Sequence, residues 1–164
     1  MSASPGAAAV AIIVASSAAD YADARTLFEE YASQLDVDLC FQGFSAELAA
    51  LPQMYGAPAG RLLLARRDGH ALGCIGVRRL GADPETCEMK RLYVRAEARG
   101  EGLGRRLAEA SLAAARELGY RRMVLDTLAT MVAARALYRE LGFTDRTAYY
   151  DNPTLGVSYL ERPL

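Results

Sequence analysis

The stretch that decides the fold is Arg99-Gly-Glu-Gly-Leu-Gly-Arg-Arg106, in which three glycines stand at alternate positions between arginines. The segment before it, TCEMKRLYV at residues 86–94, predicts a strand, and the segment after it repeats apolar residues at helical intervals. A turn from a strand into a helix directs unpaired backbone N–H groups and the positive end of the helix dipole at one point. We therefore expect this turn to bind a phosphate group.

The glycines leave the backbone bare for close approach, and the flanking arginines can add charge-assisted hydrogen bonds to a pyrophosphate. The residues concerned are Arg99, Gly100, Gly102, Gly104, Arg105 and Arg106. The dinucleotide fingerprint G-x-G-x-x-G fails because Arg105 stands at its third glycine position, and the P-loop fails because no glycine precedes a lysine. The stretch predicts a phosphorylated ligand of another kind, and the alternative is that the glycines only form a tight turn.

The rest of the chain predicts an α+β fold in the order strand, two helices, three strands, helix, strand, helix, two strands. Asp68-Gly69 marks a hairpin within residues 61–80, Ser16-Ser17 caps the first helix, and Pro52 ends a second helix at residues 45–51. The remaining expected strands are 9–15, 86–94, 121–128, 143–150 and 156–164, and the remaining expected helices are 103–118 and 131–141. Tight turns between the second, third and fourth strands, and a helical crossover after the fourth, give a mixed, mainly antiparallel sheet of about seven strands flanked by helices.

Composition limits the classes of function that the chain can have. With 164 residues, 52% hydrophobic and 24% charged, it fits one soluble domain over residues 1–164, and a net charge of −1 gives no general attraction to nucleic acid or an anionic membrane. Three cysteines without C-x-x-C spacing and the single histidine, His70, predict neither disulfides nor a metal site and favour a cytoplasmic location. Residues 1–24 hold no Lys or Arg, so we expect the apolar run Ala7–Ala15 to be a strand and not a signal peptide.

Three features together resemble the GCN5-related N-acetyltransferase (GNAT) family. Arg99, Gly102 and Gly104 match its acetyl-CoA motif, (Arg/Gln)-x-x-Gly-x-(Gly/Ala), and the segments MKRLYV and ARALYRELGF flank the motif as they do in that family. The order of elements is also similar, over nearly the whole chain. The resemblance implies a single acetyltransferase domain that binds acetyl-CoA, and it leaves the acceptor open.

The resemblance also implies which residues hold the cofactor. Main-chain groups of the turn would bind the CoA pyrophosphate, and main-chain groups at the end of the preceding strand would bind the pantetheine arm like an added strand. The first set is Arg99, Gly100, Glu101, Gly102, Leu103, Gly104 and Arg105, and the second is Leu92, Tyr93 and Val94. An N–H of Leu92 or Val94 would face the thioester oxygen and stabilise the tetrahedral oxyanion. The alternative for Leu92 and Val94 is core packing, and both roles can hold together.

Two residues are implied to be catalytic. Tyr138 stands where the family commonly places a tyrosine near the CoA sulfur, and a phenol with an ordinary pKa of about 10 can protonate the leaving thiolate. Glu88 stands where the histone acetyltransferase branch of the family carries a general base. The alternative for Tyr138 is a tyrosine packed against the sheet, and the alternative for Glu88 is a glutamate that is paired with an arginine or exposed. The chain departs from the family at Met131, where the family often has an asparagine that bonds the cofactor arm. Either Thr127 or Thr130 would replace this contact, or the contact is missing.

We therefore predict an N-acetyltransferase that passes acetyl directly to an amine of an unidentified small molecule or peptide, without nucleic-acid or membrane partners. The alternatives are a non-catalytic acyl-CoA-binding or sensing domain and a peptide-binding module that uses the edge at residues 92–94. The resemblance also allows a homodimer through the last strands. Expected walls of the acceptor pocket are Phe41, Gln42, Phe44, Tyr55, Tyr149, Tyr150 and Asn152.

Overall fold

The structure, a computed structural model, describes residues 8–164, with the side chain of Phe41 excepted. Within that range seven strands form one sheet in the order β1-β2-β3-β4-β5-β7-β6. They are β1 Ala11–Val14, β2 Arg61–Arg67, β3 His70–Arg79, β4 Thr86–Val94, β5 Arg122–Leu128, β6 Thr144–Arg146 and β7 Val157–Pro163. Only β4 and β5 pair in parallel, so the predicted mixed, mainly antiparallel sheet is confirmed. Ala7, at the start of the apolar run, lies outside the described residues.

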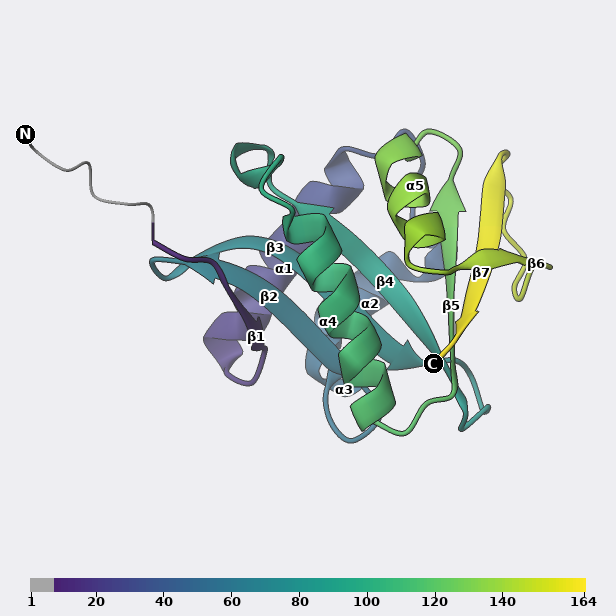
Figure 1. Ribbon diagram of the computed structural model, residues 1–164, viewed down its shortest axis with the longest axis horizontal. Helices are drawn as coiled ribbons and strands as arrows, with labels where there is room; N and C mark the ends of the chain where they lie inside the picture. Colours follow the sequence, from purple (N-terminus) through teal and green to yellow (C-terminus); the bar gives the residue numbers. More distant parts are fainter. Residues whose placement is uncertain (1–7) are drawn as a thin grey trace, which may run out of the picture.

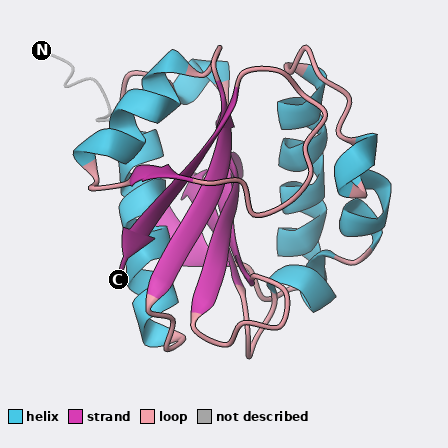
Figure 2. Cartoon of the chain, turned by 90° about the vertical axis from the view of Figure 1, so that its right-hand side faces the viewer, coloured by secondary structure: helices cyan, strands magenta, loops and turns pink. Residues whose placement is uncertain are grey.

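Helices cover both faces of the sheet (Figures 1 and 2). They are α1 Ala18–Ser33, α2 Phe44–Ala49, α3 Leu51–Tyr55, α4 Leu103–Glu117 and α5 Val132–Glu140. Leu107 and Leu112 of α4 pack with Ile75 and Leu125 on one face, and Phe28 of α1 packs on the other. None of the helices in residues 8–164 has the length and hydropathy that a membrane span requires.

The middle of the sheet is interrupted at β4. Cys74 pairs with Tyr93 and Gly76 pairs with Lys90, so Arg91 and Leu92 together stand opposite one residue of β3 and form a β-bulge. Arg91 has φ +60°, a conformation that bends the strand and that few non-glycine residues adopt. β4 then pairs with β5 only through Thr86–Glu88 against Arg122–Val124. Beyond these residues the two parallel strands separate, and the separation opens the site.

Two expected boundaries are wrong, each for a physical reason. Pro52 does not end the second helix; it lies in the first turn of α3, where the missing N–H has no intrahelical partner to lose, so two short helices replace the one expected. The strand expected at 143–150 ends at Arg146. Tyr149 and Tyr150 leave the sheet because their hydroxyls donate to Glu88 and Asp126.

Candidate active site

A long groove of about 600 Å³ lies where β4 and β5 separate. Its walls come from the end of β4, the N-terminal half of α5 and the C-terminal part of α1, with Leu92, Val94, Leu137 and Gln34 among the lining residues. β5 pairs with β4 no further than Glu88, so the edge of residues 89–94 that faces α5 lacks a strand partner there. An extended ligand can therefore add to this edge through main-chain hydrogen bonds.

At one end of the groove lies the glycine turn that leads into α4. Gly100 has φ +85° and Gly102, the N-cap of α4, has φ +74°, both in the left-handed region. The first helical bond runs from the Arg106 N–H to the Gly102 carbonyl at 3.1 Å, so the N–H groups of the three residues between them have no helical partner. A Cβ at Gly100 or Gly102 would meet nothing within 4 Å. The space beside both glycines is therefore open, which leaves room for a ligand at the turn.

The arginines around this turn differ in how they are used. Arg99 lines the long groove and is anchored by its bonds to the Val94 carbonyl and the Gln34 amide oxygen, both at 3.1 Å. Arg105 is paired with Glu140, and Arg106 donates to the Val10 carbonyl at 2.8 Å. Of the three arginines expected near a pyrophosphate, only Arg99 is among the residues that line the long groove. Glu101 is paired with Arg67 at 3.1 Å.

Tyr138 lies in a small inner cavity of about 40 Å³, which shares Leu92, Met131 and Ala134 with the long groove. Its ring packs edge-on against Phe143, with 5.9 Å between centroids. Burial raises the pKa of Tyr138 above its ordinary value of 10. The phenol is thus held in its protonated form at the inner end of the groove, as a proton donor must be.

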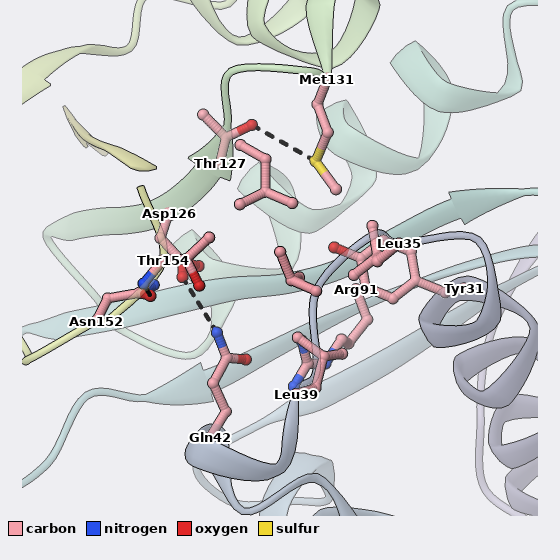
Figure 3. A pocket seen from close by; sticks show the side chains of 12 residues that line it. Tyr31, Leu35, Leu39, Gln42, Arg91, Asp126, Thr127, Met131, Asn152 and Thr154 are labelled. Atoms are coloured by element: carbon pink, nitrogen blue, oxygen red, sulfur yellow. Dashed lines mark hydrogen bonds between the residues drawn. The ribbon is translucent and has the colours of Figure 1, made fainter. Parts of the chain in front are cut away.

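Met131, directly before α5, occupies the position where the GNAT family often has asparagine. The Thr127 hydroxyl donates to its sulfur at 3.7 Å, and the two side chains point toward one another (Figure 3). Thr130 lines the long groove and Thr127 does not. Of the two threonines expected to replace the asparagine, Thr130 therefore has the better position.

Beyond the inner cavity lies a charged cluster of six side chains, Glu47, Arg78, Glu88, Lys90, Arg91 and Asp126. Arg91 donates to both oxygens of Glu47, at 2.9 and 3.3 Å, and both side chains are almost fully buried. Lys90 lies 3.7 Å from Glu88 and 3.5 Å from Asp126. With three cations and three carboxylates the cluster has no net charge, which is the condition for burying so many ions.

Glu88 is held tightly within this cluster. Arg78 donates to one carboxylate oxygen at 2.9 and 3.0 Å, and the Tyr149 hydroxyl donates to the other at 2.5 Å. The carboxylate lines an outer pocket of about 250 Å³ together with Lys90 and Tyr150, and it does not line the inner cavity of Tyr138. The two residues expected to be catalytic therefore face different compartments.

The carboxylate that does reach the inner cavity is Asp126 of β5, which sequence analysis missed. It lines both the inner cavity and a narrow pocket beside Gln42 and Asn152 (Figure 3). Tyr150 donates to it, and the Gln42 amide donates at 3.4 Å. The available signal was a carboxylate directly after the apolar run Met123–Leu125 of a predicted buried strand, where a charged residue is uncommon.

The expected pocket walls separate into two groups. Gln42, Tyr149, Tyr150 and Asn152 line the outer or the narrow pocket. Phe44 packs on the Arg91 guanidinium, 5.2 Å from ring centroid to Cζ, and Tyr55 was wrongly expected at the pocket because it is a fully buried core residue packed against Phe28. The side chain of Phe41 lies outside the described residues. In residues 8–164 no group of three His, Cys, Asp or Glu side chains could hold a metal ion.

Comparison with known proteins gives one consistent result. The family model described as the acetyltransferase (GNAT) family matches residues 23–143. An uncharacterized N-acetyltransferase of Schizosaccharomyces pombe is 44% identical over 86% of this chain and 86% of its own length, and the N-acetylaspartate synthetase of Rattus norvegicus is 34% identical over 71% of this chain and 40% of its own length. A Salmonella typhimurium structure determined with its cofactor acetyl-CoA has a TM-score of 0.70 and 19% identity, covering 95% of this chain and 94% of that one.

Proposed function

Because the chain belongs to the acetyltransferase (GNAT) family and is an N-acetyltransferase, we propose that it takes acetyl from acetyl-CoA and passes it directly to an amine of a small molecule or peptide. The observation that carries the proposal is the continuity of the site. The groove lies between the glycine turn and the free edge of β4, and at Leu92 and Met131 it adjoins the inner cavity of Tyr138. Lys90, Arg91 and Asp126 of the charged cluster line the same inner cavity. The glycine turn, Tyr138 and the charged cluster thus lie along adjoining cavities.

For the cofactor we propose that the turn from Arg99 to Arg105 binds the pyrophosphate. The unpaired N–H groups at the start of α4 and the open space before Gly100 and Gly102 support this. We further propose that residues 92–94 bind the pantetheine arm along the free edge of β4, which would put the thioester beside Leu92 and Tyr138. The bulge at Arg91 and Leu92 supports an oxyanion site there, because a bulged residue leaves its N–H out of the strand ladder.

The chemistry proposed needs no covalent enzyme intermediate. A carboxylate removes one proton from the acceptor ammonium, and the neutral nitrogen attacks the thioester carbonyl carbon. The tetrahedral intermediate collapses as its carbon–sulfur bond breaks and the nitrogen loses a second proton. Tyr138 donates a proton to the leaving thiolate and is reprotonated as the nitrogen's proton is released, so the products are the amide, CoA thiol and one proton.

Glu88 is the proposed base, and its position makes the proposal specific. Because Glu88 faces the outer pocket, it would accept the proton from an acceptor entering there or through a water molecule. Asp126 reaches the inner cavity and is the second candidate. The test of Glu88 is kinetic: Glu88→Gln should lower kcat with the KM for the amine nearly unchanged, whereas a purely structural Glu88 would show loss of stability without a selective change in kcat.

The test of the proposed function is calorimetric titration of the protein with acetyl-CoA and with CoA, followed by an amine panel assayed for release of free thiol. The panel includes amino acids, aspartate among them, because one relative is named for N-acetylaspartate. Binding of acetyl-CoA with thiol release on at least one amine supports the enzyme. Binding without release on any amine would support instead an acyl-CoA-binding domain, and absence of binding would contradict the role of the glycine turn.

A further inference from the structure

The inner cavity and the outer pocket meet at Lys90, which is paired with Asp126. Lys90 lines both compartments, and Asp126 lines the inner cavity and the narrow pocket next to it. The long groove meets the inner cavity from the opposite side, at Leu92 and Met131. An acceptor that passes from the outer pocket into the inner cavity would therefore pass Lys90 and come next to its partner Asp126.

Lys90 makes longer ion-pair contacts than the nearest contacts of the arginines in the charged cluster. The Lys90 ammonium lies 3.3 Å from the Gln42 amide oxygen, 3.5 Å from Asp126 and 3.7 Å from Glu88. Arg78 and Arg91, by contrast, each reach one carboxylate at 2.9 Å, Glu88 and Glu47 respectively. Lys90 is also the only lysine of the chain, whereas every other cation of the cluster is a guanidinium. An ammonium on a flexible stem can change partners without the loss of a bidentate geometry.

Charge balance then limits what can enter. A primary ammonium that takes the place of Lys90 at Asp126 leaves Lys90 short of one carboxylate and brings a fourth cation to a buried cluster of three carboxylates. At low dielectric such an unbalanced charge is strongly unfavourable. A carboxylate on the same acceptor removes the imbalance, since it gives Lys90 a new partner as the ammonium takes the old one.

We propose that the acceptor is a free amino acid, bound as a zwitterion with its ammonium on Asp126 and its carboxylate on Lys90. The inference rests on the proposed function and names its substrate class. The ammonium and the α-carboxylate of an amino acid are joined through one carbon, which suits two protein charges that are themselves neighbours. A peptide N-terminus does not supply this negative charge, because the carboxyl group next to its ammonium is bound in an uncharged amide.

The test compares amino acids with their α-amides, which keep the ammonium and the shape but lose the negative charge. In the wild-type protein we expect kcat/KM for an amino acid to exceed that for its amide by about 10- to 100-fold, as for a charge-assisted hydrogen bond. Lys90→Met should bring this ratio close to one, chiefly through a higher KM for the acid, and Lys90→Arg should restore most of it. Arg25→Met, which removes an exposed cation of α1, is the matched control and should leave the ratio unchanged.

Equal use of acid and amide by the wild-type protein, or a ratio that survives Lys90→Met, would overturn the inference. Failure of the proposed function has a different signature, because no amine would then release thiol. Binding separates the two: in calorimetry on the CoA-loaded protein, an amino acid should bind at least tenfold more tightly than its amide. Normal CoA affinity of the Lys90 variants shows that they are folded, and equal affinity for acid and amide would count against the inference even without turnover.

Discussion

The two sides of β4 are built from different parts of the chain. On the side of the long groove the features are the free strand edge, a turn with positive φ at Gly100 and Gly102, and the start of α4, all within residues 89–105. On the side of the charged cluster, side chains from residues 42 to 150 converge, and each is positioned by the charges of the others. One side depends on the backbone of a continuous segment, and the other on side chains that only the complete fold brings together.

This difference predicts different responses to substitution. A backbone site tolerates changes of side chain but not of conformation, because its N–H groups are provided by the path of the chain. A cluster of buried charges tolerates neither the loss of one charge nor its displacement, because each loss leaves a partner without compensation. Substitutions on the two sides should therefore separate stability, turnover and cofactor affinity.

The largest effect is expected from Arg91→Met in the charged cluster. It leaves Glu47, only 1% exposed, as a buried carboxylate without its bidentate partner, and we expect a loss of about 3–5 kcal/mol in the free energy of unfolding. The positive φ at position 91 strains arginine and methionine alike, so it does not contribute to the difference in stability between the wild-type protein and the variant. The measurement is denaturant unfolding followed by circular dichroism.

The double variant with Glu47→Met and Arg91→Met is the internal control, since it removes both charges and should recover most of the lost stability. Arg61→Met breaks an exposed pair with Glu117 and should change stability by about 1 kcal/mol or less. A double variant as unstable as Arg91→Met alone would show that packing around the guanidinium, and not the ion pair, holds this side.

The second effect, on turnover, is expected from Tyr138→Phe at the junction of the two sides. Removing the proposed proton donor should lower kcat by about 100-fold or more, while CoA affinity stays near that of the wild-type protein. Since burial raises the pKa of Tyr138 above its ordinary value of 10, the acid form persists to alkaline pH. The kcat of the wild-type protein should therefore show no decline from this group as pH rises from 7 to about 10.

Tyr120→Phe is the matched control, because the Tyr120 hydroxyl donates to the Ala59 carbonyl, away from the groove. It should reduce stability and leave kcat unchanged. An unchanged kcat in Tyr138→Phe would assign the tyrosine to packing against Phe143 and would require another proton source for the thiolate.

The fold and the groove side could be predicted from sequence, and the contrast between the sides explains why. Glycines at 100, 102 and 104, the strand at 86–94 and the helix after them are local patterns, and the structure does bring Leu92, Val94, Arg99 and Gly104 to one groove. Their roles in binding stay predictions. The boundary error at Pro52 arose because proline also suits the first turn of a helix, and the error at residues 147–150 arose from contacts distant in sequence.

The charged cluster could not be predicted, because its members have no fixed spacing. Lys90 and Asp126 are 36 positions apart and become neighbours only where two parallel strands begin to separate. Hydrophobic periodicity places a residue on a face of a strand but does not say which residue of another strand it meets. The local signs were the carboxylate of Asp126 within RMVLDTL and the run EMKR at residues 88–91, where buried charge had to be compensated from elsewhere.

The third effect, on cofactor affinity, tests the backbone side. Gly102→Ala puts a Cβ at φ +74° and should lower stability by about 1–2 kcal/mol through left-handed strain. The added methyl group faces open space in the free protein, where a bound phosphate would lie, so we expect CoA affinity to fall about tenfold in addition. Calorimetry measures the CoA affinity, and denaturant unfolding measures the loss of stability.

Gly69→Ala is the matched control, because Gly69 has φ +79°, also meets nothing within 4 Å, and lies in the β2–β3 hairpin turn. Both variants should lose similar stability, and only the Gly102 variant should lose affinity. Equal CoA affinities in the two variants would mean that the turn does not receive the pyrophosphate.

The smallest effect is expected at the N-terminus of α1, a contact as local as the glycine turn but remote from the site. Asp20 accepts the N–H groups of Ser16 and Ser17, and the Ser17 hydroxyl accepts the N–H of Asp20. The bonds from the Ser16 and Ser17 N–H groups lower the pKa of Asp20 from 3.8 to about 2. A carboxyl whose pKa is lower in the folded state stabilises the fold above its unfolded pKa, and that contribution is lost as pH falls from about 4 to 2.

Asp20→Asn should therefore lower the free energy of unfolding by about 1 kcal/mol at pH 7, and the difference from the wild-type protein should shrink toward pH 2. Asp23→Asn removes another partner of Arg66 without touching the cap, so it separates the ion pair from the backbone bonds. A difference that stays constant from pH 7 to pH 2 would show that the capping geometry does not need the charge. CoA affinity should stay the same in both variants, because a local contact on this helix can change stability without reaching either side of β4.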